Sequence, residues 1–199
     1  SGDYNFFFLN IFGKEATIKY KLSHSITTSW GMSLYEQSCK IIAKKVGYEC
    51  ETQKKNLGQI NSEVMLYISS LQNDNNRVPN KDEEIEKIRQ LSTPGNANEH
   101  PNSTVDVWIT KPSGEEILID ITTVKNNKKG FRSLNEKNLT WAALKFSQDT
   151  NANISPYFAI PYNPEGNTID DIEYSRFISG NYDRKDILAV SYTHLRAHE

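Results

Sequence analysis

The stretch that decides the fold is TVDVWITKPSGEEILIDIT, which runs from Thr104 to Thr122. Its two ends, Thr104–Thr110 and Glu116–Thr122, are rich in β-branched and aromatic residues, which is typical of strands. Between them, residues 111–114 (KPSG) have the composition of a tight turn. We therefore expect a β-hairpin that carries one aspartate on each strand, Asp106 and Asp120.

These two aspartates are the candidate catalytic residues. Carboxylates that converge from neighbouring strands make an oxygen-rich site for a hard cation such as Mg²⁺. The backbone carbonyl of Ile121 would add a further metal ligand. Mg²⁺ at such a site can hold a phosphate and activate water for phosphodiester hydrolysis. The simpler alternative is that Asp106 and Asp120 are ordinary polar strand residues, because two aspartates at this spacing occur by chance in many proteins.

The spacing resembles the PD-(D/E)XK nuclease pattern, in which an Asp is followed on the next strand by a second acid, one spacer and a lysine. Asp106 takes the first position, Asp120 the second, and Thr122 stands where the pattern has lysine. Threonine cannot supply a cation that stabilises developing charge on a phosphate. Lys125 is the nearest replacement, because its long stem can bring the ammonium back to the site.

The composition indicates one domain with a polar surface. The chain of 199 residues is long enough for a real core, although only 37% of it is hydrophobic. The formal net charge is -2, so binding to a polyanion needs a local basic patch. Cys39 and Cys50 are expected to be reduced thiols. No apolar run is long enough to span a bilayer and no signal peptide is visible, so we expect a cytoplasmic protein.

Apolar spacing predicts three helices before the hairpin. The first covers Trp30–Val46 and is followed by a short strand at Tyr48–Lys54. The others cover Asn61–Leu71 and Asn80–Leu91, the last with Asn80 as its cap. The first helix has a stripe of residues that we expect to be buried: Met32, Tyr35, Cys39, Ile42 and Val46. Glu36 lies beside this stripe and is either a surface glutamate or a third acid that reaches the metal site.

A basic segment follows the hairpin. Lys125–Arg132 is predicted as a loop, and Ser133 with Glu136 forms a capping-box signature that starts the next helix. Lysines and an arginine near a helix N-terminus suit DNA phosphates, although a charge run is more commonly a solvated face. The candidate DNA contacts are Lys128, Lys129 and Arg132. Two later strands are predicted at Tyr157–Pro161 and Lys185–Val190. This order of elements fits an α/β domain with a mixed central β-sheet flanked by α-helices.

Four segments, in order, resemble type II restriction endonucleases of the TdeIII kind. They are Thr27–Gln37, Asp120–Lys125, Leu139–Leu144 and Pro156–Pro164. The resemblance covers roughly Ser23 to Pro164 and implies the PD-(D/E)XK restriction-endonuclease-like fold. It also implies Mg²⁺-dependent cleavage of duplex DNA at a short specific site, by a homodimer that serves restriction-modification defence.

The resemblance also implies roles for individual residues. By position, Asp106 and Asp120 would be metal ligands, Glu36 the acid of the first helix, and Lys125 the second lysine of the family's segment. Thr122 stands where the family has its catalytic lysine. We expect the endonuclease-like domain to span residues 1–190, incomplete at both ends. Residues 191–199 resemble a peptide that recurs where sequencing-adaptor DNA is translated, so we interpret them as a non-native tail.

Two alternatives stay open from the sequence. A PD-(D/E)XK relative disabled by Thr122 would bind DNA in a salt-dependent manner without cutting it. An unrelated α/β interaction module would have no nucleic-acid role. Separation of the two carboxylates by more than about 7 Å would exclude a shared Mg²⁺, because ligand distances are near 2.1 Å. An ammonium of Lys125 that points away from the acids would favour the disabled relative.

Overall fold

The computed structural model describes residues 33–74, 76–122, 128–160 and 183–189. The described part contains a five-stranded sheet with the strands in chain order. The first three strands are antiparallel neighbours, and the last two join in parallel. The strands are β1 Glu49–Lys55, β2 Thr104–Thr110, β3 Glu116–Ile121, β4 Ile154–Ile160 and β5 Ile187–Ala189. The predicted α/β class with a mixed sheet is confirmed.

The predicted hairpin is the β2–β3 pair. Val107 pairs with Ile119, and Thr110 pairs with Glu116 at the turn. The Lys111 N–H donates to the Glu115 carbonyl over 2.9 Å, and Gly114 takes the left-handed conformation with φ of 84°. Glycine adopts this conformation without a steric penalty, so the turn chemistry fixes the register of the two strands.

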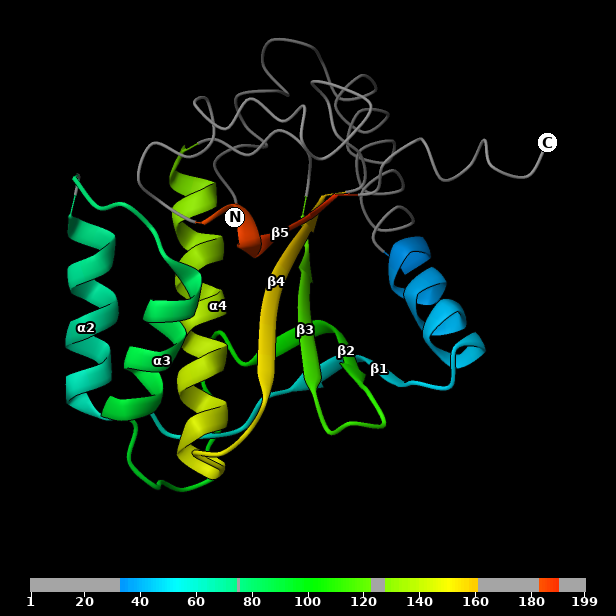
Figure 1. The fold of residues 1–199 in the computed structure, drawn as a ribbon, viewed down its shortest axis with the longest axis horizontal. Coiled ribbons are helices and arrows are strands. Elements are labelled where there is room, and N and C mark those ends of the chain that lie inside the picture. The colour runs from blue at the N-terminus through cyan, green and yellow to red at the C-terminus, as the bar shows by residue number, and fades with distance from the viewer. Residues whose placement is uncertain (1–32, 75, 123–127, 161–182, 190–199) are drawn as a thin grey trace, which may run out of the picture.

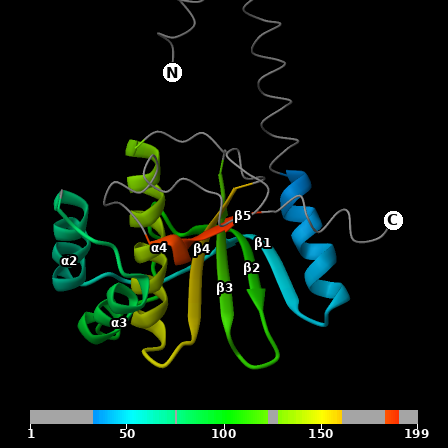
Figure 2. The ribbon, with the colours of Figure 1, turned by 45° about the horizontal axis from the view of Figure 1, so that its top comes forward.

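Helices cover both faces of the sheet (Figure 1 and Figure 2). One face carries α2 Ser62–Asn73, α3 Lys81–Leu91 and α4 Lys128–Gln148, and the helix over residues 33–45 lies on the other face. Asn61 and Asn80 cap α2 and α3 by accepting backbone N–H groups. No helix in the described part of the chain combines the length and the apolar composition that a membrane crossing needs.

The main core lies between α4 and the sheet. Trp141, Leu144 and Phe146 of α4 are fully buried, and Leu118 of β3 packs in the same layer. A smaller cluster on the opposite face joins Ile119 and Ile121 to half-buried side chains of the helix over residues 33–45. Because Leu118 and Asp120 alternate with Ile119 and Ile121 along β3, Asp120 belongs to the face that α4 covers.

The start of α4 differs from the prediction. The helix begins at Lys128, so Lys128, Lys129 and Arg132 lie within its first turns, and Ser133 is an exposed residue inside it. The capping-box prediction was therefore wrong. The reason is Phe131, which is buried against Phe158 with ring centroids 5.9 Å apart. Burial of this ring stabilises a helical turn before Ser133, and lysine and arginine favour helix.

The buried stripe of the first helix also differs. Tyr35 and Cys39 pack on the sheet as expected, but Ile42 and Val46 are 63% and 58% exposed. Ala43 is buried in their place. The contact therefore follows an i, i+4, i+8 row, which is narrower than the predicted stripe. Met32 lies outside the described residues. Cys39 and Cys50 are free thiols, as expected.

Replacement of Gly58 by alanine should destabilise the packing of α4 on the segment that follows β1. An added Cβ would lie 2.3 Å from the Leu144 carbonyl oxygen and 2.7 Å from the Ser147 hydroxyl. We expect the free energy of unfolding to fall by about 1–3 kcal/mol, as in other overpacked sites. Urea denaturation measures this value. Gly47→Asn is the control, because open space surrounds Gly47 and asparagine tolerates its left-handed backbone. An equal loss in both variants would contradict the expectation.

Candidate active site

Asp106 and Asp120 come together at the β2–β3 hairpin. The two side chains interact directly, because the charge of Asp106 and a side-chain hydrogen bond to it both raise the pKa of Asp120. Asp120 is only 7% exposed, and Asp106 is half-buried. The Asp106 Oδ2 accepts the backbone N–H of Ile121 over 2.8 Å, which locks the first acid beside the strand that carries the second.

Burial dominates the electrostatics of Asp120. It raises the pKa of Asp120 to about 6, because a carboxylate loses its hydration there. The Lys137 ammonium lowers the pKa and the Asp106 carboxylate raises it, both with smaller effects. Two carboxylates so close together favour any cation that neutralises them.

Lys137, a residue that the sequence analysis did not select, supplies such a cation. It lies on α4, and its ammonium donates a hydrogen bond to Asp120 Oδ1 in an ion pair. The same ammonium is 5.1 Å from the centroid of the Trp141 ring, one helical turn further along. Lys137 falls three residues after Leu134 and four before Trp141 in a helix whose apolar residues face the sheet. That position is the one signal that would have selected it.

Glu36 lies next to the carboxylate pair through an intermediary, Gln53. The Gln53 amide donates to Glu36 Oε1 over 2.8 Å and to Asp106 Oδ1 over 3.2 Å. The helix over residues 33–45 therefore brings Glu36 into the neighbourhood of Asp106, and the Gln53 amide of β1 bridges the two acids. No sequence pattern pointed to Gln53.

Gln53 also has an unusual backbone. Its φ of 54° places it in the left-handed region, at the position of β1 between the register pairs of Thr52 with Val107 and Lys54 with Val105. A non-glycine residue in this region costs on the order of 1–3 kcal/mol. The surrounding structure therefore holds Gln53 beside Asp106 against its own backbone preference.

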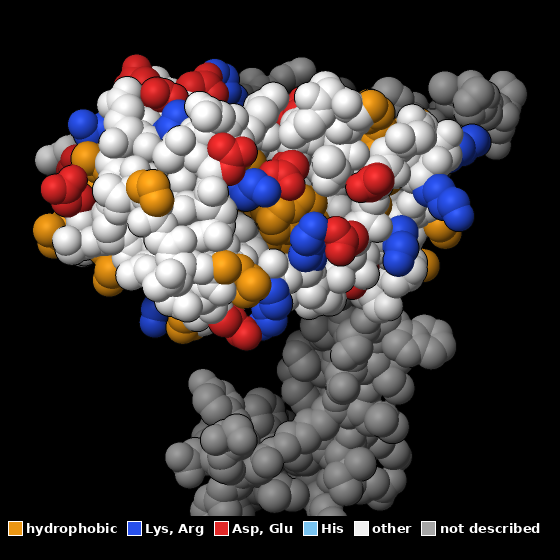
Figure 3. Space-filling view, turned by 90° about the horizontal axis from the view of Figure 1, so that it is seen from below, with side chains coloured by type: hydrophobic (Ala, Val, Ile, Leu, Met, Phe, Trp, Pro, Cys, Tyr) orange, Lys and Arg blue, Asp and Glu red, His pale blue; other side chains and the backbone are white. Residues whose placement is uncertain are grey.

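The predicted DNA contacts are only partly described. Lys129 is exposed in the first turn of α4, and Arg132 is half-exposed. Lys128 begins α4, whereas Lys125 lies outside the described residues. Figure 3 shows one end of the molecule, where basic and acidic side chains are interspersed around an apolar patch. This face is the end away from the start of α4, where the predicted contacts Lys128, Lys129 and Arg132 lie.

The donor set of the site suits Mg²⁺. Mg²⁺ prefers oxygen ligands and is commonly held by one or two carboxylates, with water and substrate phosphates completing the shell. Asp106 and Asp120 provide two such carboxylates, and Ile121 follows directly in the chain. Among the described residues, no group of three or more His, Cys, Asp or Glu side chains converges on one point. Mg²⁺ bound by two carboxylates typically keeps several positions for water and phosphate oxygens.

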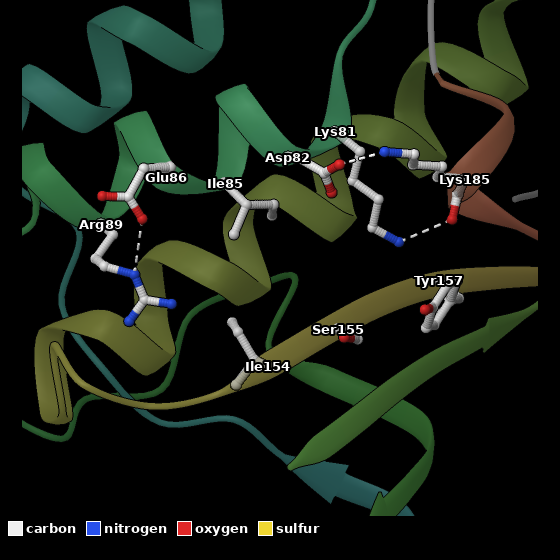
Figure 4. A pocket seen from close by; sticks show the side chains of 9 residues that line it. All are labelled: Lys81, Asp82, Ile85, Glu86, Arg89, Ile154, Ser155, Tyr157 and Lys185. Atoms are coloured by element: carbon white, nitrogen blue, oxygen red, sulfur yellow. Dashed lines mark hydrogen bonds and ion pairs between the residues drawn. The ribbon is translucent and has the colours of Figure 1, made fainter.

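A separate cavity of about 450 Å³ lies between α3 and β4 (Figure 4). Its charged groups are paired with each other: Lys185 with Asp82, and Arg89 with Glu86. At its edge, the buried Lys81 ammonium donates to the backbone carbonyls of Pro156 and Lys185. Burial lowers the pKa of Lys81 to about 8. These contacts hold β5 and the preceding turn against α3. The cavity therefore has a structural role, and it is separate from the site of the two aspartates.

Comparison with known proteins found a matching family. A family model described as "Type II restriction endonuclease, HinfI" matches residues 3–190. The match spans the hairpin, the helix that carries Glu36, and the whole of α4. No curated protein and no solved structure matches the chain.

Proposed function

The chain belongs to the HinfI family of type II restriction endonucleases, and on this premise we propose that it hydrolyses duplex DNA at a specific site with Mg²⁺. The observation that carries the proposal is the carboxylate pair: Asp106 and Asp120 within hydrogen-bonding reach at the end of one hairpin. The pair fits the acidic positions of the PD-(D/E)XK pattern, and its oxygen donors fit the cation that this chemistry needs.

The proposed reaction is hydrolysis of one phosphodiester bond in each strand. Bound Mg²⁺ would supply Lewis-acid polarisation of the phosphate and a more acidic water. Asp106 and Asp120 would hold the cation through their carboxylates, and the backbone carbonyl of Ile121 would be the third protein ligand. A water oxygen forms a new bond to phosphorus while the bond to the 3′ oxygen breaks in line. The proton that water loses is balanced by the proton that the 3′ oxygen gains, so the products carry a 5′ phosphate and a 3′ hydroxyl.

Other residues have supporting roles in this proposal. Glu36 acts as an accessory acid, in keeping with its contact to Gln53. Lys128, Lys129 and Arg132 at the start of α4 bind DNA phosphates. The enzyme works as a homodimer, because two-fold symmetric DNA sites are matched by two-fold symmetric proteins. Its place of action in this proposal is the cytoplasm. The narrower kinship with enzymes of the TdeIII kind is part of the same proposal.

A disabled relative is the second candidate, because Thr122 occupies the position of the motif lysine. Such a protein would bind DNA with an affinity that falls steeply as salt rises, and would not cut it. The two candidates differ in turnover and share the fold.

The test is digestion of plasmid and phage DNA with Mg²⁺, with and without a chelator. Discrete fragments that need Mg²⁺ and accept ligation through 5′ phosphates would support the endonuclease. Salt-sensitive DNA binding in Ca²⁺ without any cleavage in Mg²⁺ would favour the disabled relative. Absence of both cleavage and binding would contradict both candidates.

A further inference from the structure

The motif position occupied by Thr122 lacks the lysine cation of the nuclease pattern, and what replaces it is inferred on the basis of the proposed function. Thr122 follows Asp120 at the position of the pattern's lysine, and its side chain carries no charge. Its backbone N–H continues the pairing with β4 by donating to the Ala159 carbonyl over 2.9 Å. Phosphodiester cleavage nevertheless develops negative charge that a nearby cation stabilises. The described site already has one ammonium, and it comes from a different element.

We propose that Lys137 of α4 supplies the charge-stabilising cation that the motif lacks at Thr122. Its ammonium is bonded to Asp120 itself, which is one member of the carboxylate pair. An ammonium has three donors. Asp120 accepts one of them, and the others suit a non-bridging phosphate oxygen or the attacking water beside Asp120. The Trp141 ring centroid lies 5.1 Å from the same ammonium, so the ion pair and the ring both favour this position of the cation before DNA binds.

A second ion pair in the same layer shows what a purely structural lysine looks like here. Lys145 lies eight residues further along α4 and pairs with Glu116, four residues before Asp120 on β3. Eight helical residues span about 12 Å and four strand residues about 13 Å, so helix and strand match in register. Lys137 and Lys145 are 25% and 23% exposed, and both lie over a tryptophan ring.

The two pairs differ in their surroundings. Glu116 accepts Lys145 at one oxygen and the Trp108 indole N–H at the other, over 3.2 Å, so its contacts are those of a packing residue. Asp120 has a second carboxylate within hydrogen-bonding reach. Only the Lys137 pair is therefore placed where a divalent cation and a phosphate would meet. Lys145 is the matched control that the fold itself provides.

The activity test compares Lys137→Met with Lys145→Met and Lys125→Met. If Lys137 is the cation, Lys137→Met should lower kcat for plasmid cleavage by about 10²–10³-fold, as loss of one charge-stabilising donor does elsewhere. Lys145→Met should cleave within about threefold of the wild type, although both variants lose a similar half-buried ion pair. The double variant Thr122→Lys with Lys137→Met should regain at least tenfold of the lost rate, because it restores the cation at the motif position. Cleavage by Lys137→Met within threefold of the wild type, or a large loss in Lys125→Met alone, would overturn the proposal.

A second readout does not depend on cleavage. Calorimetric titration of the DNA-free protein with Mn²⁺ should show tighter binding in Lys137→Met by about threefold to tenfold, since removal of the ammonium removes repulsion of the metal. Lys145→Met should leave the affinity unchanged. If the wild type cuts no DNA, the proposed function fails by itself, and this titration still decides where Lys137 acts. An unchanged Mn²⁺ affinity in Lys137→Met would then show that the Lys137 ammonium does not lie at the metal site, and would overturn the proposal.

Discussion

Replacement of Asp120 by asparagine should lower the rate of Mg²⁺-dependent DNA cleavage by about 10³-fold or more. The reason is loss of a carboxylate that would hold the metal, and a bound metal contributes several kcal/mol to stabilisation of the transition state. The free energy of unfolding should stay the same or increase. Burial raises the pKa of Asp120 to about 6. Ionisation of this carboxyl group at neutral pH therefore lowers the stability of the folded protein, and asparagine removes that cost. Rates come from plasmid cleavage, and stability from urea denaturation of the same preparations.

The matched control for this experiment is Glu116→Gln. Glu116 lies on the same strand and also pairs with a lysine of α4, yet it has no neighbouring carboxylate among its described contacts. We expect this variant to cut DNA within about threefold of the wild type. Cleavage by Asp120→Asn within tenfold of the wild type would contradict the metal site. A loss of activity that follows a loss of folding in both variants would point to a structural role for the helix–strand ion pairs.

The sequence could predict the hairpin and its two acids because the information is local. Alternation along Thr104–Thr110 and Glu116–Ile121, together with the turn before Glu115, fixes which residues face each other. Asp106 and Asp120 then converge through strand pairing alone. The helices capped by Asn61 and Asn80 follow local rules in the same way.

The contacts of Lys137 and Gln53 with the two aspartates could not be predicted from the sequence, because they depend on packing between distant segments. Lys137 reaches Asp120 only when α4 lies on the sheet at one particular rotation, which buried residues such as Trp141 and Leu144 set. Gln53 reaches Asp106 only through β1 pairing and a left-handed backbone that its residue type does not favour. The start of α4 was mispredicted for a similar reason, since a long-range contact of Phe131 outweighed the local capping signal.

A buried ion pair contacts the half of α4 that carries Lys137. Arg77, in the segment between α2 and α3, bonds Glu84 of α3 through Nε over 3.0 Å and through a second nitrogen. It also donates to Asn135 Oδ1 over 3.2 Å, and Gln72 of α2 donates to the same oxygen. Both members of the pair are nearly inaccessible to solvent. The network therefore ties α2 and α3 to α4 two residues before Lys137.

Replacement of Arg77 by methionine should lower the free energy of unfolding by about 3–5 kcal/mol, because Glu84 would remain as a buried charge without its partner. This is a large part of the 5–15 kcal/mol that typically stabilises a domain. The double variant with Glu84→Gln should recover much of the loss, since it removes the uncompensated charge. Lys55→Met, which breaks the exposed pair with Glu99, should cost less than about 1 kcal/mol. Urea denaturation of the three variants measures these differences.

The same variant connects stability to the proposed role of Lys137. At a temperature where Arg77→Met stays folded, loosening of Asn135 should let this part of α4 shift relative to Asp120. A displacement of about 1 Å at a catalytic group can cost on the order of 10²-fold in rate. We therefore expect kcat to fall by about tenfold or more in Arg77→Met, while Lys55→Met stays near the wild type. An unchanged kcat in a measurably destabilised Arg77→Met would show that the Lys137–Asp120 contact holds α4 in register without the buried network.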